Sequence, residues 1–83
     1  MGYVRAHIRL ITQRDLLDFM SKIGEYKEEN FIIENKDASV RVNAHSMLGV
    51  LYATNDFNDN TYLVNLTNDG CIPSFVEEYR VNG

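Results

Sequence analysis

Two histidines and one cysteine have the widest chemical range in this sequence, since imidazole serves in acid–base catalysis and thiolate in nucleophilic attack. His7 falls on the polar side of an alternating segment and is interpreted as a solvated sheet residue. His45 directly precedes a predicted helix, where an exposed residue is the simplest interpretation. Cys71 follows Gly70 with no adjacent cation, which indicates an incidental thiol. We expect none of the three to act as a catalyst.

Metal and cofactor motifs are also missing from the sequence. Asp56, Asp59 and Asp69 lack the alternating oxygen ligands and the closing glutamate of a calcium loop. One cysteine allows no intramolecular disulfide and no Cys/His cluster for zinc. The five glycines form no phosphate loop, and two dissimilar histidines do not assemble a catalytic triad. We therefore expect no metal, no cofactor and no enzymatic activity.

The elements that position these side chains follow from hydrophobic periodicity. The predicted order is a strand at 3–10, a helix at 15–23, a hairpin of strands at 31–35 and 39–43, a helix from Ser46 to about Ala53, a strand at 61–66, and a short closing helix around 72–79. Thr12 or Gln13 leads into the first helix and Gly24 ends it.

Two of these elements have a predicted buried side. In the last strand Tyr62, Val64 and Leu66 are expected to face inward. The closing helix has its apolar side chains at i, i+3, i+4 and i+7, namely Ile72, Phe75, Val76 and Tyr79.

This element order contains no repeat and no linker, so it predicts one α+β domain over residues 1–83 with helices on one face of a sheet. The other face is expected to meet water, and it carries Arg5, His7, Arg9, Ser39 and Arg41. Gly49 lies inside the second predicted helix, where glycine costs about 1 kcal/mol relative to alanine. Close approach of another surface, or helix-to-sheet packing that excludes a side chain, would explain it.

Charge and hydropathy exclude several partner classes. The formal net charge is -4, and no lysine or arginine lies between Val42 and Tyr79. Nucleic-acid binding needs clustered cations, so we expect no nucleic-acid partner. No apolar run approaches the roughly 20 residues of a spanning helix, so we expect no membrane insertion. The lone cysteine and the lack of a basic, apolar leader favour a cytoplasmic location.

Residues 40–51 read Val-Arg-Val-Asn-Ala-His-Ser-Met-Leu-Gly-Val-Leu. This block resembles the histidine-containing phosphocarrier (HPr) family of the bacterial sugar phosphotransferase system. The resemblance implies an open-faced β-sandwich, in which three helices cover one face of a four-stranded antiparallel sheet. In the family, a phosphorylatable histidine followed by Ala-Arg-Pro begins the first helix. Here residues 11–15 read Ile-Thr-Gln-Arg-Asp, so the resemblance does not extend to the phosphohistidine relay.

The family's regulatory serine, at the start of the second helix, falls on Ser46. A phosphate there would meet free backbone N–H groups and the positive end of the helix dipole. In relatives that lack the histidine, the phosphoserine form docks on a sugar-responsive transcription factor. The resemblance therefore implies a regulatory binding protein, possible partners being the HPr serine kinase, a transcriptional regulator or a phosphotransferase-system component. The implied docking residues are His45, Ser46, Met47, Leu48 and Leu51.

Two alternatives stay open. One is a phosphocarrier with a non-standard acceptor, His45 or His7. Asp15 could in principle form an acyl phosphate, but capping of the first helix accounts for it. The other is a degenerate interaction module that keeps the HPr fold without phosphorylation.

Overall fold

A computed structural model describes residues 4–67 and 70–81 of the 83-residue chain. The elements are, in order, β1 (Ala6–Ile8), α1 (Gln13–Ile23), a 3₁₀ helix (Gly24–Tyr26), β2 (Phe31–Glu34), β3 (Arg41–Asn43), α2 (Met47–Asp56), β4 (Thr61–Asn65) and a further 3₁₀ helix (Ser74–Tyr79). The predicted order of strands and α-helices is confirmed.

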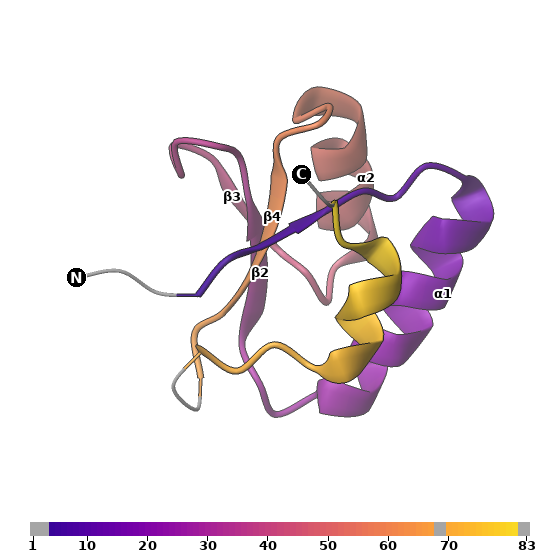
Figure 1. Ribbon diagram of the computed structural model, residues 1–83, viewed down its shortest axis with the longest axis vertical. Helices are drawn as coiled ribbons and strands as arrows, with labels where there is room; N and C mark the ends of the chain where they lie inside the picture. Colours follow the sequence, from indigo (N-terminus) through magenta and orange to yellow (C-terminus); the bar gives the residue numbers. More distant parts are fainter. Residues whose placement is uncertain (1–3, 68–69, 82–83) are drawn as a thin grey trace.

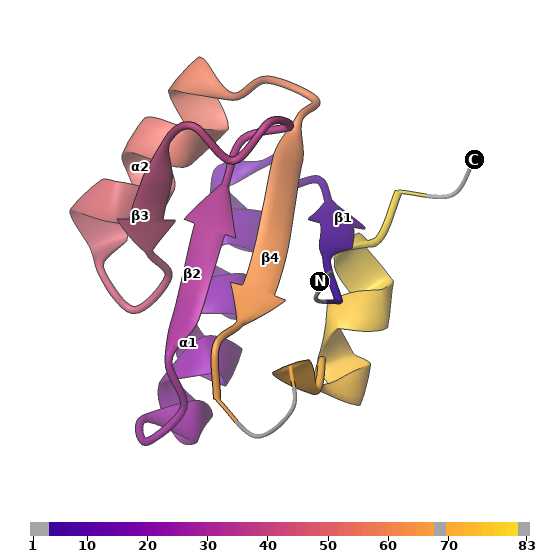
Figure 2. The same ribbon diagram turned by 90° about the vertical axis from the view of Figure 1, so that its left-hand side faces the viewer.

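Within the described residues, the strands form one four-stranded antiparallel sheet in the order β1–β4–β2–β3, seen face-on in Figure 2. β4 pairs with both β1 and β2, so Leu63 lies opposite Ala6 on one side and opposite Ile33 on the other. Directly opposite residues share a face of a sheet. Since all three side chains are fully buried, they define the face that packs on the core.

The first helix begins at a capping box. Thr12 Oγ1 accepts a hydrogen bond from the Asp15 amide at 3.0 Å, and the Asp15 carboxylate accepts one from the Thr12 amide at 3.2 Å. Gly24 is the C-terminal cap. The buried side of α1 consists of Leu16, Phe19 and Ile23, which follow the predicted 3.6-residue period.

The helices lie together on one side of the sheet, as Figure 1 shows for α1, α2 and the 3₁₀ helix at 74–79. Phe19 of α1 contacts two rings of the last segment, with centroids 6.2 Å from Phe75 and 5.8 Å from Tyr79. Such tilted and edge-on pairs are favourable aromatic geometries. The chain is thus an α+β protein with an open antiparallel sheet.

The opposite face of the sheet carries a charged network rather than a second layer. Glu34 is fully buried there, with its carboxylate oxygens 2.8 Å from Arg5 Nε and 3.1 Å from Arg41 Nε. The Arg5 guanidinium also lies 4.0 Å from the centroid of the Tyr62 ring. The residues expected to meet water are exposed or partly exposed, namely Arg5, His7, Arg9, Ser39 and Arg41, whereas the Glu34 carboxylate between Arg5 and Arg41 is buried.

The inward direction predicted for the last strand is wrong. Leu63 faces the core, whereas Tyr62 lies on the opposite face and Leu66 is half exposed. Val64 is buried but is not among the residues of the core cluster. The apolar set of this segment is Tyr62, Val64 and Leu66, yet the pairing of Leu63 with Ala6 and Ile33 turns the other set toward the core.

Several elements also differ in extent or type from the prediction: α2 continues to Asp56 rather than ending near Ala53, and β3 begins at Arg41 rather than at residue 39. The strand predicted at 3–10 is regular only over Ala6–Ile8, and Tyr3 lies outside the described residues. The closing element is a 3₁₀ helix rather than an α-helix, with Val76 and Tyr79 buried. Their spacing of three residues equals one 3₁₀ turn. In the described part of the chain, every helix is too short or too polar to cross a bilayer.

Candidate functional site

Ser46 is the N-cap of α2, as the sequence predicts. Its backbone is extended, with φ -97° and ψ 121°, and its Oγ accepts a hydrogen bond from the Gly49 amide at 3.2 Å. No acidic side chain lies in the first turn of α2. The serine is partly exposed as a residue and stands at the positive end of this helix.

Gly49 is explained by the close approach of α2 to β3. A Cβ atom at this position would lie 3.0 Å from the carbonyl oxygen of Asn43 and 3.3 Å from Cβ of Val42. Helix-to-sheet packing, one of the two predicted explanations, therefore accounts for the glycine. It also fixes the outward side of α2, because Val50 and Ala53 are buried against the same layer.

The outward side of α2 is apolar. Met47 and Tyr52 are each 45% exposed, Leu51 is 37% exposed and Leu48 is 80% exposed. No charged side chain occurs in α2 before its last residue, Asp56. A helix that is apolar on its outer as well as its inner side is typical of a helix that is buried by a neighbour.

Two residues from the α1 side extend this apolar region, and the sequence analysis missed them. Ile11, just before α1, is 74% exposed, and Leu17 is 48% exposed. Both line a groove of about 290 Å³ between α1 and α2, together with Met47 and Leu51. We call this set the α1–α2 surface; it comprises Ile11, Leu17, Met47, Leu48, Leu51 and Tyr52.

The sequence carries a weak signal for the two missed residues. Besides its three buried residues, α1 has two further apolar residues, Met20, which packs partly against the core, and Leu17, which does not. Ile11 follows the alternating strand segment at a position where no partner strand is predicted. Only the three-dimensional arrangement places both beside α2.

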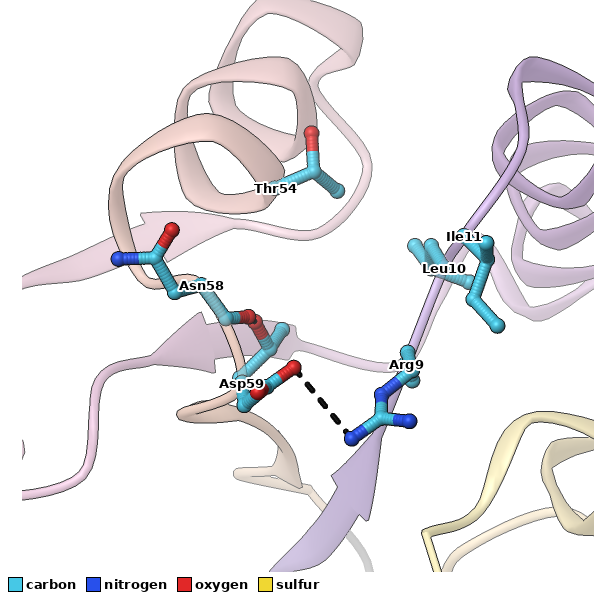
Figure 3. Close-up of a pocket in the computed structure, with 7 residues that line it drawn as sticks. Arg9, Leu10, Ile11, Thr54, Asn58 and Asp59 are labelled. Atoms are coloured by element: carbon cyan, nitrogen blue, oxygen red, sulfur yellow. Dashed lines mark hydrogen bonds and ion pairs between the residues drawn. The ribbon is translucent and has the colours of Figure 1, made fainter.

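A second, polar cleft of about 620 Å³ adjoins this groove (Figure 3). The ion pair between Arg9 Nη2 and Asp59 Oδ1, 3.4 Å apart, crosses it. Leu10, Ile11 and Thr54 line both the cleft and the groove. Ile11 therefore projects where the two hollows meet, at the start of α1.

At the start of α1 the Asp15 carboxylate serves as a helix cap through its Oδ2 atom. This oxygen accepts hydrogen bonds from the amides of Ile11 and Thr12, each at 3.2 Å. These bonds satisfy backbone donors that the helix leaves unpaired. Asp15 is thus a structural cap in this arrangement.

Both histidines are held by backbone carbonyl groups. His45 Nε2 lies 2.9 Å from the carbonyl oxygen of Glu29, and its ring packs edge-on against Phe31. His7 Nε2 contacts the carbonyl oxygen of Asp59, and its ring stacks on Tyr62 with centroids 4.5 Å apart. Since a carbonyl only accepts, Nε2 carries the proton in each contact. The ring of His45 is thus engaged internally, although its residue adjoins Ser46.

The other candidate groups remain separate. Cys71 is exposed. Asp56 forms a hydrogen bond with the Tyr52 hydroxyl, and this bond together with the carboxylate charge raises the pKa of Tyr52. Asp59 pairs with Arg9, and Asp69 lies outside the described residues. Among residues 4–67 and 70–81, no three such groups gather as metal ligands would.

The structure thus brings Ser46, Met47, Leu48 and Leu51 onto one exposed region, with His45 turned toward the loop before β2. Comparisons with protein-family models, with curated proteins and with solved structures find no match. The function must therefore be argued from the fold and from the α1–α2 surface.

Proposed function

We propose that this chain is an HPr-like regulatory protein that binds other proteins through the α1–α2 surface and does not use a phosphohistidine relay. The observation that carries the proposal is the exposed, uncharged side of α2, which begins immediately after the N-cap Ser46. A helix terminus and an apolar surface then form one continuous region. We further propose the HPr-like open-faced sandwich as its fold family and the cytoplasm as its location.

The composition of this surface suits a protein partner. Six large apolar side chains are exposed together, whereas scattered single apolar residues are the rule on monomer surfaces. Apolar anchors of this kind dominate the energy of protein interfaces. The groove beside them offers a cavity for a partner's side chain. Ser46, Met47, Leu48 and Leu51 are the proposed contacts, and the ring of the adjacent His45 binds the Glu29 carbonyl.

Phosphorylation of Ser46 is the proposed switch. A phosphate on its Oγ would replace one acceptor of the Gly49 amide by several, at the positive end of α2. It would add about -1.5 to -2 charges next to Met47 and Leu48. Since no acidic group in the first turn opposes it, the modified serine would be accommodated without unfolding the helix. A partner that carries arginine would gain a binding site, whereas an apolar partner would lose one.

A kinase reaction tests whether Ser46 alone is phosphorylated. The protein is incubated with an HPr serine kinase and ATP, and its intact mass is measured. We expect a single added phosphate that disappears in Ser46→Ala and persists in Ser39→Ala, the matched serine in the β2–β3 turn. Absence of phosphate, or its persistence in Ser46→Ala, removes the switch from the proposal.

A second experiment tests docking. Calorimetry with a purified transcriptional regulator of the kind that binds phosphoserine HPr compares wild type, Ser46→Asp and Leu48→Asp. We expect binding by Ser46→Asp that Leu48→Asp abolishes when added to it. For the phosphocarrier alternative, the protein is mixed with the first enzyme of the system and phosphoenolpyruvate. Acid-labile phosphate on a histidine would favour that alternative over the regulatory function.

A further inference from the structure

The groove between α1 and α2 differs in chemistry from the hollows beside it. All of its lining residues are uncharged: Leu10, Ile11, Thr12, Gln13, Leu16, Leu17, Met47, Leu51, Thr54 and Asn55. The adjoining cleft contains Arg9 and Asp59, and a third hollow at Ile11 contains Arg9, Asp15, Glu78 and Arg80. The groove is therefore the hollow in this region that favours an apolar, uncharged occupant.

An apolar side chain of that kind stands on the same surface. Leu48 is 80% exposed and adjoins Met47, which lines the groove, on the outer side of α2. A protruding leucine and an apolar groove on one surface are self-complementary. Two copies related by a two-fold axis would each offer both parts, which is the requirement for an isologous interface.

We infer that two copies of this chain associate through the α1–α2 surface, with Leu48 of each copy seated in the groove of the other. When no other partner is bound, the groove is thus occupied by Leu48 of a second copy. This inference goes beyond the proposed function and does not depend on it. The dimer covers the surface assigned to other partners, so self-association and partner binding compete.

Charge favours this surface for self-association. The chain carries a formal net charge of -4, so most ways of bringing two copies together oppose acidic groups. Residues 47–55 of α2 carry no charge, and neither does the groove. Across a two-fold axis normal to α2 the two helices run antiparallel. The N-terminal end of each then faces the C-terminal end of the other, where Asp56 lies, so opposite ends of the dipoles meet.

The exposed area of the α1–α2 surface is large enough for a dimer interface. Taking about 200 Å² for a large side chain, the exposures of the six residues correspond to about 660 Å² per copy. Full burial of these side chains in two copies would remove about 1,300 Å² of surface, above the roughly 1,000 Å² expected of a biological interface. An interface near this lower limit indicates a reversible dimer rather than an obligate one.

Sedimentation equilibrium of the unmodified full chain tests the inference. Reductant is present throughout, because the exposed Cys71 could otherwise link copies covalently. From about 10 μM to about 1 mM, we expect the average mass to rise from one chain toward two. Leu48→Asp should remain a single chain over the same range. Leu66→Asp, at another exposed leucine that lies outside the α1–α2 surface, should dimerise like wild type.

Circular dichroism establishes that both variants are folded, which is expected because neither leucine belongs to the core. Concentration-dependent amide shifts in the wild type provide a second measurement and should concentrate at Leu17, Leu48 and Leu51. A chain that stays single at about 1 mM overturns the inference and leaves the surface to a different protein. Equal loss of dimer in Leu66→Asp, or shifts confined to other residues, also overturns it. The kinase reaction at Ser46 is unaffected by these outcomes, so failure of the dimer and failure of the proposed function are distinguishable.

Discussion

The carboxylate of Glu34 lies 2.8 Å from Arg5 Nε, although β4 lies between β1 and β2 in the sheet. Arg5 precedes β1 and Glu34 ends β2, so the contact passes over the central strand. Arg41 of β3 approaches the same carboxylate from the other side, at 3.1 Å. A single buried acid thus connects both edges of the sheet.

Replacing Glu34 with glutamine should lower the free energy of unfolding by about 1–3 kcal/mol, because two arginines lose a charged acceptor in a buried position. This loss of stability is smaller than that expected for a fully buried ion pair, because Arg5 and Arg41 remain 29% and 46% exposed. Urea unfolding of the wild type and the variant measures the loss. Glu77→Gln, which removes an exposed pair with Arg80, is the control and should change stability by less than about 0.5 kcal/mol. Equal effects of the two substitutions would contradict a structural role for the Glu34 network.

Gly49 and Gly24 form a matched pair for alanine substitution. Gly49→Ala should destabilise by about 1–3 kcal/mol, since the new Cβ would press on the Asn43 carbonyl and overpacking outweighs the gain in helix propensity. Gly24→Ala should leave the stability of the protein unchanged or raise it by up to about 1 kcal/mol. The φ of Gly24 is -61°, which alanine adopts readily, and the added Cβ would meet no other part of the protein within 4 Å. Thermal unfolding compares the two. The same sign for both would argue against the close approach of α2 to β3.

Ala38 occupies a left-handed conformation with φ 61° in the turn between β2 and β3. This conformation costs an L-residue about 1–2 kcal/mol, of which the greater freedom of unfolded glycine offsets part. We therefore expect Ala38→Gly to stabilise the protein by about 0.5–1 kcal/mol in urea unfolding. Ala53→Gly, in the buried side of α2, should instead destabilise it. A lower midpoint for Ala38→Gly would count against the turn geometry.

The capping role of Ser46 is separable from its modification. Ser46→Ala should cost about 0.5–2 kcal/mol, because the Gly49 amide loses its side-chain acceptor. Ser46→Asp retains an acceptor and adds a negative charge at the N-terminus of α2, so it should match the wild type in stability. Chemical denaturation of the wild type, Ser46→Ala and Ser46→Asp gives the order of their stabilities. Destabilisation by aspartate as large as by alanine would show that an anion is not accommodated at this position.

The turn around Asp37 should make a small contribution to the pH dependence of stability. Hydrogen bonds from the Ser39 side chain and amide hold the pKa of Asp37 below its ordinary value of 3.8. Because the folded pKa is the lower one, ionised Asp37 stabilises the fold above the unfolded pKa, and the effect is lost as pH falls through the folded pKa. Wild type should thus exceed Asp37→Asn in stability near neutral pH, and the difference should shrink below about pH 4. A difference independent of pH would show that the charge is not involved.

Local chemistry made much of the fold predictable. Thr12, Gly24 and Ser46 bounded the two α-helices because capping and helix termination depend on neighbouring residues alone. Which side chains of β4 face the core was not predictable in this way, since the strands that pair with β4 come from distant segments of the chain. The same reason hides the contact between Arg5 and Glu34, whose partners are set by strand order.

The residues of the candidate site also differ in whether they could be predicted from the sequence. Ser46, Met47, Leu48 and Leu51 follow one another in sequence, so a capped helix with an apolar outer side was accessible to prediction. Ile11 and Leu17 join them only after the sheet has brought α1 beside α2. The ring of His45, predicted at the docking surface, binds the Glu29 carbonyl, a contact that no local pattern encodes.

The Arg5 guanidinium has one more consequence, for the dynamics of the sheet. Its Nη2 donates to the carbonyl oxygens of Asn35 and Lys36, at 2.8 Å and 2.9 Å, and so reaches the tip of the β2–β3 hairpin from the far edge. Separating the hairpin from the sheet therefore breaks hydrogen bonds to the N-terminal segment as well. Amide protons of both edges should therefore exchange with solvent through a shared opening event, rather than by independent fraying of each edge.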